Sequence, residues 1–120
     1  MSVPSEELQR IFTEAQVRLA EASRQLSLVK SQLQAKQREK RLGELTAKEL
    51  STLASDVATY RAVGKMFIKV DLTLLRKELT PRIQDAEKEI KALERTQTKL
   101  ERELEQHQNM LKQFAMSANA

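Results

Sequence analysis

The residue types that most often do chemistry are sparse in this chain of 120 residues. It has no cysteine and a single histidine, His107, so disulfides, thiol nucleophiles and thiolate metal sites are excluded. A metal site or an acid–base pair needs a second group at suitable spacing, and none accompanies His107. The carboxylates Asp85, Glu87 and Glu89 follow one another along an expected helix, away from any pocket. We therefore expect no enzymatic activity, no cofactor and no metal.

Positive charge is the other feature that could bind a ligand, because the formal net charge is +4. The cations gather at Lys36, Arg38, Lys40 and Arg41. Such a run could bind nucleic acid, but it has no interleaved aromatic residue and Glu39 interrupts it. The alternative is that these cations stabilise the C-terminal turns of a helix. The pattern favours this alternative over nucleic-acid binding.

The composition predicts long helices. Hydrophobic residues make up 40% and charged residues 32% of the chain, with 3% aromatics, two glycines and two prolines. Aromatic residues are too few for an ordinary globular core, whereas spaced Leu, Ile and Ala are too many for a disordered chain. No apolar run approaches the roughly 20 residues that span a bilayer, and the N-terminus does not resemble a secretory signal. We expect a cytoplasmic protein without membrane contact, with the nucleus as an additional location.

A first helix is expected over residues 5–42. Ser5 can act as its N-cap, and Gly43 is placed to end it. Between them, apolar residues recur in alternating steps of four and three over about four heptads, as in a coiled coil. They are Leu8, Phe12, Ala15, Leu19, Ala22, Leu26, Val29 and Leu33.

A second helix is expected over residues 72–116, with Asp71 as its N-cap and Pro81 as the site of a kink or of a restart capped by Thr80. Its seam has the same spacing. The members are Leu79, Ile83, Ala86, Ile90, Leu93, Gln97, Leu100, Leu104, His107, Leu111 and Phe114.

The two seams have matched lengths, which predicts that they pair within one chain. An antiparallel pair would place Arg41 near residues 72–76 and Leu8 beside residues 107–111. Both termini would then lie together at one end of the pair and the middle segment at the other end. A parallel homodimer is not required.

The middle segment, residues 43–71, is expected to hold a short helix and a β-hairpin. A capping box from Thr46 to Glu49 would start the short helix. The strands are expected over residues 57–63 and 66–70, which are rich in β-branched and aromatic residues. Gly64 lies between them and can adopt the positive φ that a tight turn needs. The predicted fold class is mainly α, an antiparallel two-helix coiled-coil hairpin with a short helix and one β-hairpin at the connecting end, within a single domain of residues 1–120.

This hairpin favours assembly with other chains. A two-stranded sheet alone is marginally stable and leaves two edges unpaired. Strands from other subunits could complete it, in a homo- or hetero-oligomer, unless it folds back on its own helices. The expected oligomerisation residues are Val57, Tyr60, Val63, Gly64, Met66, Phe67, Ile68 and Val70.

The chain resembles prefoldin, and within it the β-class, subunit-1-like chains. The resemblance covers the whole chain, but its most specific part is the string that runs from Tyr60 through Val63-Gly64-Lys65-Met66-Phe67. A single hairpin is typical of the β class. The resemblance implies an ATP-independent chaperone, a hetero-hexamer of α- and β-class subunits whose hairpins form a β-barrel platform.

In that family the tips of the coiled coils hold unfolded proteins such as actin and tubulin and deliver them to a group II chaperonin. The resemblance implies client contacts at the two helix ends that form the tip. The candidate residues are Leu8, Ile11, Phe12, Met110, Leu111 and Phe114. Ile11 lies off the seam and is expected to stay exposed if Phe12 points inward. The other interpretation of these residues is that they only complete the seam.

A different class of function also fits the helices. The chain could be a structural coiled-coil adaptor in a multiprotein or nucleic-acid-associated complex, or it could belong to a different prefoldin-like complex with a regulatory role. An adaptor has no evident use for the hairpin.

Overall fold

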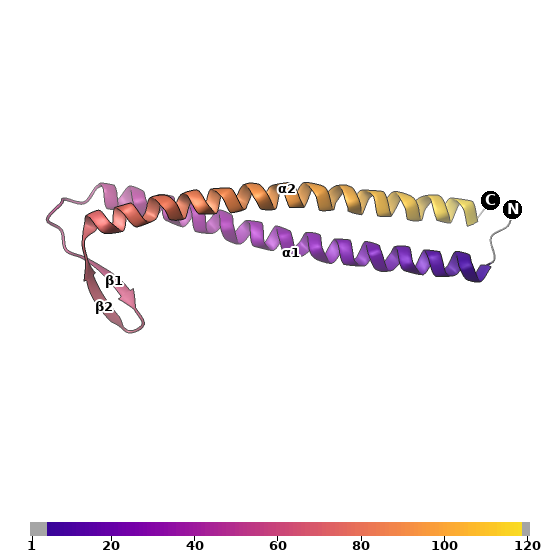
Figure 1. Ribbon diagram of the computed structural model, residues 1–120, viewed down its shortest axis with the longest axis horizontal. Helices are drawn as coiled ribbons and strands as arrows, with labels where there is room; N and C mark the ends of the chain where they lie inside the picture. Colours follow the sequence, from indigo (N-terminus) through magenta and orange to yellow (C-terminus); the bar gives the residue numbers. More distant parts are fainter. Residues whose placement is uncertain (1–4, 119–120) are drawn as a thin grey trace. The chain divides into compact units, whose positions relative to one another are not determined.

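The computed structural model describes residues 5–118 and contains two long helices and one β-hairpin (Figure 1). The elements are α1 (Ser5–Ser51), β1 (Thr59–Val63), β2 (Met66–Val70) and α2 (Leu72–Ala118). The mainly α class with one antiparallel hairpin is therefore confirmed. The chain divides into two compact units: residues 1–32 with 93–120, and residues 33–92.

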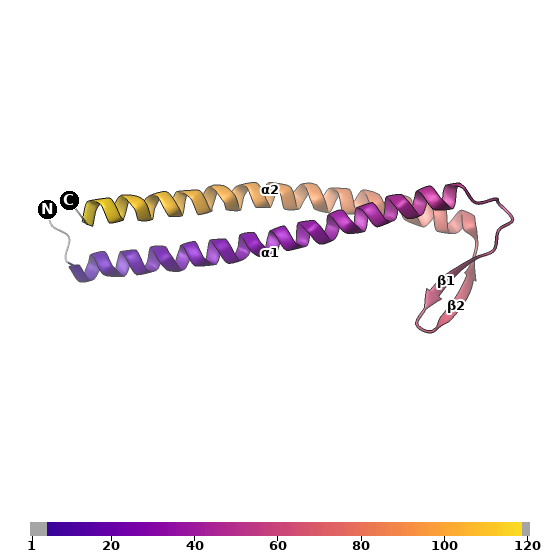
Figure 2. The ribbon, with the colours of Figure 1, turned by 180° about the vertical axis from the view of Figure 1, so that it is seen from behind.

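The first unit pairs the beginning of α1 with the end of α2, which run side by side in both views (Figures 1 and 2). Leu26 and Val29 of α1 form a buried cluster with Leu100 of α2. Leu93 and Leu104 pack against this cluster, and Ala15 and Ala22 are buried along the same seam of α1. The 3-4 spacing thus predicted which side chains of each helix are buried, although not which of them meet.

The second unit pairs the end of α1 with the beginning of α2 in a different register from the expected one. Lys36 Nζ lies 2.6 Å from a carboxylate oxygen of Glu89, and Gly43 lies against Ile83. The expected pairing of Arg41 with residues 72–76 is wrong by about three helical turns. The shift arises because α1 continues to Ser51 instead of ending at residue 42.

Gly43 does not end α1, and the structure gives it another role. A Cβ atom at this position would lie 2.9 Å from Ile83 Cγ1, closer than carbon atoms pack. A glycine inside a helix costs about 1 kcal/mol relative to alanine. The close approach of α2 therefore explains a residue that the sequence pattern assigned to a helix end.

Two further predictions of helix starts are wrong, because the residues concerned lie inside longer helices. Thr46 does not begin a short helix, because its hydroxyl donates to the Leu42 carbonyl at 2.8 Å, as a threonine inside a helix does. The expected short helix is instead the last turns of α1. Thr80 and Pro81 likewise lie inside α2, which runs without interruption. A proline removes one backbone hydrogen bond, and packing of the apolar face outweighs that loss.

The start of α2 agrees with the sequence. Asp71 precedes the helix, and its carbonyl accepts the first helical hydrogen bond, from the Leu75 N–H at 3.1 Å. Leu72 is buried directly after it. Between residues 5 and 118, neither helix is long and apolar enough to cross a membrane.

Candidate interaction surfaces

The β-hairpin is built around a two-residue turn. β1 and β2 pair antiparallel from Thr59 opposite Val70 to Val63 opposite Met66. Gly64 has a φ of 61°, and no other described residue has a positive φ. Positive φ at the first turn residue alone is the sign pattern of a type II′ turn, which matches the twist of the strands. The role predicted for Gly64 in the turn is therefore confirmed.

The first strand is shorter than expected. β1 begins at Thr59, so Val57 and Ala58 lie outside the ladder. The Val57 N–H instead donates to the Ala54 carbonyl at 3.1 Å, within a turn of the connecting segment. The Val57 side chain is exposed next to the hairpin, not part of it.

Strand alternation and the observed register sort the hairpin side chains into two faces. One face, called here the Val63 face, carries Thr59, Arg61, Val63, Met66, Ile68 and Val70. The opposite face, called the Tyr60 face, carries Tyr60, Ala62, Phe67 and Lys69. Both faces combine large apolar residues with a cation, so neither resembles a purely solvated surface.

The apolar side chains of both faces are open to solvent. Phe67 is 75% exposed on the Tyr60 face, and Met66 is 65% exposed on the Val63 face. Tyr60, Val63 and Ile68 are exposed as well. The described chain forms only this two-stranded sheet, and its outer edges have no strand partner. The hairpin is therefore not folded back on its own helices, and it can extend its sheet only with strands of other chains.

Two arginines connect elements of the second unit, one from the hairpin and one from α2. Arg61 of β1 forms an ion pair with Glu78 of α2. Arg76 of α2 donates from Nη2 to the carbonyls of Leu50, at 2.6 Å, and Leu53, at 3.1 Å. The last carbonyls of a helix lack intrahelical donors, and the half-buried guanidinium supplies them.

Sequence reasoning missed these arginine contacts. The signal was a cation near the start of α2, but its acceptors could be named only once the end of α1 was known. With the helix expected to end at residue 42, the free carbonyls were expected there and not at Leu50, eight residues later.

A second candidate surface lies where α1 begins and α2 ends, within the first unit (Figure 2). Leu8, Leu111 and Phe114 are half-buried along the seam. Phe12 is 37% exposed, and Met110 is exposed on α2. The structure thus brings the six expected tip residues to the same end of this unit.

The expectation that Ile11 stays exposed while Phe12 points inward is not met. Ile11 is half-buried, whereas Phe12 is exposed. Continuing the heptad phase of the seam, Ile11 takes the g position, which flanks the partner helix and can lie over its edge. Two helices alone offer little cover to a side chain as large as phenylalanine.

Two cations of the basic cluster, Lys36 and Lys40, form ion pairs. Lys36 pairs with Glu89 of α2 and, at 3.2 Å, with Glu39; Lys40 lies 3.5 Å from Glu87. The hydrogen bond to Glu89, followed by that to Glu39, raises the pKa of Lys36 above its ordinary value. These cations therefore link α1 to α2. They do not lie at the end of a helix, as the sequence suggested, because α1 continues to Ser51.

His107 is half-buried in the seam. Among residues 5–118, no group of three or more His, Cys, Asp or Glu side chains could hold a metal ion.

Comparison with known proteins agrees with this geometry. A sequence model of the family described as "Prefoldin subunit" matches residues 13–118. "Probable prefoldin subunit 1" of Schizosaccharomyces pombe is 33% identical over 91 residues, which cover 76% of this chain and 81% of that protein. "Prefoldin subunit 1" of Homo sapiens is 29% identical over 114 residues, 95% of this chain and 93% of that protein. The crystal structure of the prefoldin beta subunit from Thermococcus strain KS-1 has a TM-score of 0.75 at 25% identity, covering 93% of this chain and 94% of that one.

Proposed function

Since this chain belongs to the prefoldin family, as a β-class, subunit-1-like member, we propose that it binds unfolded proteins at its coiled-coil tip without ATP and passes them to a group II chaperonin. Its place is that of a co-chaperone subunit within a hexamer of prefoldin subunits. The exposed hairpin is the observation that carries the assembly part of the proposal.

In this proposal the hairpin supplies two strands to a β-sheet shared with neighbouring subunits. Phe67 and Met66 are 75% and 65% exposed on opposite faces, and both strand edges are free. Each large apolar side chain that becomes buried stabilises the assembly by about 1.5–3 kcal/mol. The assembly residues are Val57, Tyr60, Val63, Gly64, Met66, Phe67, Ile68 and Val70. A coiled-coil adaptor, the alternative function, would leave this surface without a role.

Client binding is assigned to the end of the first unit. Phe12 and Met110 are exposed there, beside the half-buried Ile11 and Leu111. Methionine and phenylalanine side chains adapt to many apolar partners, which suits weak contacts with unfolded segments of actin- or tubulin-like chains. Leu8 and Phe114 complete the set. The cytoplasm, where such clients fold, is the proposed location, with the nucleus in addition.

The assembly proposal is tested by replacing Val63 and Phe67 with Asp in the full chain, coexpressed with α-class and other β-class subunits. One residue lies on each face, so a charge opposes burial of both. Native mass spectrometry should show a hexamer with one copy of the unchanged chain and none of the variant. The matched control is Leu28→Asp, which alters a 52% exposed leucine of α1 in the first unit. Normal incorporation of the double variant would refute the hairpin as the assembly surface.

The client proposal needs a measurement of client binding that does not change when only assembly is affected. Deleting residues 1–12 and 110–120 should leave the hexamer intact and weaken its suppression of the aggregation of unfolded actin. The point variants Phe12→Ser and Met110→Ser should act in the same direction with less effect. Equal suppression by the deleted and complete hexamers would refute the assignment of the tip.

A further inference from the structure

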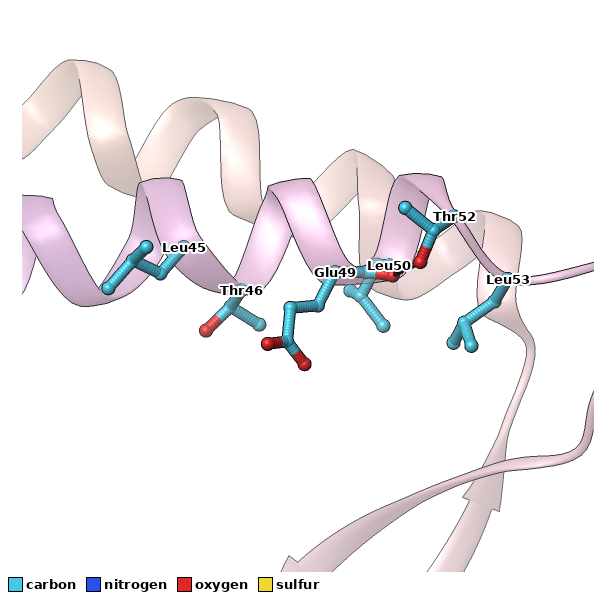
Figure 3. Close-up of a pocket in the computed structure, with 6 residues that line it drawn as sticks. All are labelled: Leu45, Thr46, Glu49, Leu50, Thr52 and Leu53. Carbon is cyan, nitrogen blue, oxygen red and sulfur yellow. Dashed lines mark hydrogen bonds between the residues drawn. The ribbon is translucent and has the colours of Figure 1, made fainter.

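The last turns of α1 carry exposed leucines. Continuing the heptad phase of the seam, Leu45 takes position f, the outermost position, which is normally polar. Leu42 is 65% and Leu45 45% exposed, and Leu53 is exposed just after the helix. Figure 3 shows Leu45, Glu49 and Leu53 projecting to the same side of α1.

These side chains line a groove within the second unit (Figure 3). Its remaining lining residues are Thr46, Leu50 and Thr52. Both threonine hydroxyls donate to backbone carbonyls of α1 itself, Thr46 to Leu42 at 2.8 Å and Thr52 to Glu49 at 2.7 Å. The groove therefore offers apolar contacts and one charge, the exposed Glu49 carboxylate, which forms no ion pair with the described residues.

In a shared sheet, strand pairing covers the edges of a hairpin but does not bury the apolar side chains on its two faces. Neighbouring strands cover the two edges, and closure of a barrel covers one face. The opposite face remains, and on this hairpin both faces are apolar. A second apolar surface outside the sheet must cover it.

We propose that the groove formed by Leu45, Glu49 and Leu53 receives the outer face of the β-hairpin of an adjacent prefoldin subunit. The inference rests on the proposed function, because it needs the hexamer. Two observations select this occupant. The groove directly precedes the segment that leads into β1, so it is continuous with the assembly surface. Its chemistry also complements a hairpin face of the kind that this chain itself shows, where Phe67 and Tyr60 lie beside Lys69.

In that arrangement aromatic side chains fill the space between Leu45 and Leu53, and a lysine of the same face pairs with Glu49. The apolar contacts supply affinity, and the ion pair selects the orientation of the hairpin.

Cross-linking gives the most direct test, since the chain has no cysteine that would complicate site-specific labelling. A photo-reactive benzoylphenylalanine at position 45 of the full chain, assembled into the hexamer, should label the hairpin of one adjacent subunit. The same probe at position 28, also an exposed leucine of α1, should label no hairpin. Labelling from position 45 that reaches only other segments, or no subunit at all, would overturn the inference.

Affinity provides a second, independent test. Leu45→Gln and Leu53→Gln should each weaken incorporation into the hexamer by about tenfold, the lower end of the effect of one buried leucine, because each is already partly covered in the single chain. Glu49→Lys should weaken it as well, and Leu28→Gln should leave it unchanged. Circular dichroism of each variant verifies that the helices form, as expected for side chains that are exposed in the single chain.

The outcomes separate this inference from the proposed function. If Val63→Asp with Phe67→Asp abolishes assembly while the groove variants assemble normally, the groove inference fails and the hairpin proposal stands. If all of these variants assemble normally, both fail.

Discussion

Replacing Gly43 with alanine tests how closely α1 and α2 approach in the second unit. At an ordinary position inside a helix this change would stabilise the fold by about 1 kcal/mol, since glycine disfavours helix. Here the new Cβ would lie 2.9 Å from Ile83 Cγ1. Overpacking of this kind costs about 1–3 kcal/mol, and the χ1 angle of an isoleucine in a helix is stiff. We expect a net destabilisation of about 1 kcal/mol.

A double-mutant cycle isolates the contact. Ile83→Ala removes the opposing Cγ1 atom, so Gly43→Ala in that background should show only the gain in helix propensity, about 1 kcal/mol. The effect of the same substitution thus changes sign, and the coupling between positions 43 and 83 amounts to about 2 kcal/mol. The matched control is Ser31→Ala at an exposed site of α1, whose effect should be the same with and without Ile83.

The assay is urea denaturation of the full chain, followed by circular dichroism, with the free energy of unfolding taken from the midpoint and slope. The close approach would be refuted if Gly43→Ala stabilised the chain that retains Ile83 as much as it stabilises the Ile83→Ala variant. Such a result would still place Gly43 inside a helix, but without a neighbouring side chain close enough to exclude a Cβ atom.

Three other perturbations follow from contacts in the second unit. Arg76→Gln removes the charged donor from the Leu50 carbonyl and should cost about 1.5–3 kcal/mol, with Arg76→Lys in between; equal unfolding midpoints for all three chains would contradict the capping role. Gly64→Val should weaken assembly because a left-handed φ costs about 1–2 kcal/mol with a side chain, whereas Gly64→Asn should retain most of it; equal assembly of both would contradict the strained turn. The raised pKa of Lys36 means that its pairing with Glu89 stabilises the fold below the ordinary lysine pKa of about 10.5 and is lost as pH rises through the raised value. Glu89→Gln should therefore lower the melting temperature at pH 8, and the difference from the unchanged chain should shrink as the pH rises above about 10.5; a difference that does not depend on pH would argue against the ion pair.

The seams and the hairpin could be predicted from the sequence because both depend on local spacing. An apolar residue in every third or fourth position fixes the buried face of a helix whatever its partner is. β-Branched residues around Gly64 fix a tight hairpin, and the observed register from Val63 to Met66 agrees with it.

The end of α1 could not be predicted, because a glycine after a helical pattern has two physical causes. At a helix end it relieves a strained φ, and in a helix interior it admits a neighbouring helix. Only the position of Ile83 distinguishes these causes for Gly43. One wrong end then shifted the predicted pairing of the two helices, and with it the expected neighbours of Arg41.

In the candidate site too, features that depend on local spacing could be predicted, and contacts between distant residues could not. Exposure of Tyr60, Phe67 and Met66 followed from their number and from the small size of the sheet. The contacts of Arg76 with Leu50 and Leu53 join residues far apart in the sequence, and they depend on the register that local patterns left open. The groove at Leu45 was hidden for the same reason, since a separate short helix was expected to start at Thr46.

The exposed hairpin also affects the fate of the subunit before it is assembled with its partners. A newly made copy displays Phe67 and Met66 on free strand edges, the same features by which a cell's quality-control machinery distinguishes damaged proteins from sound ones. Copies made in excess of the other subunits are then expected to be degraded or to aggregate. The hairpin thus couples the abundance of this subunit to the supply of its neighbours.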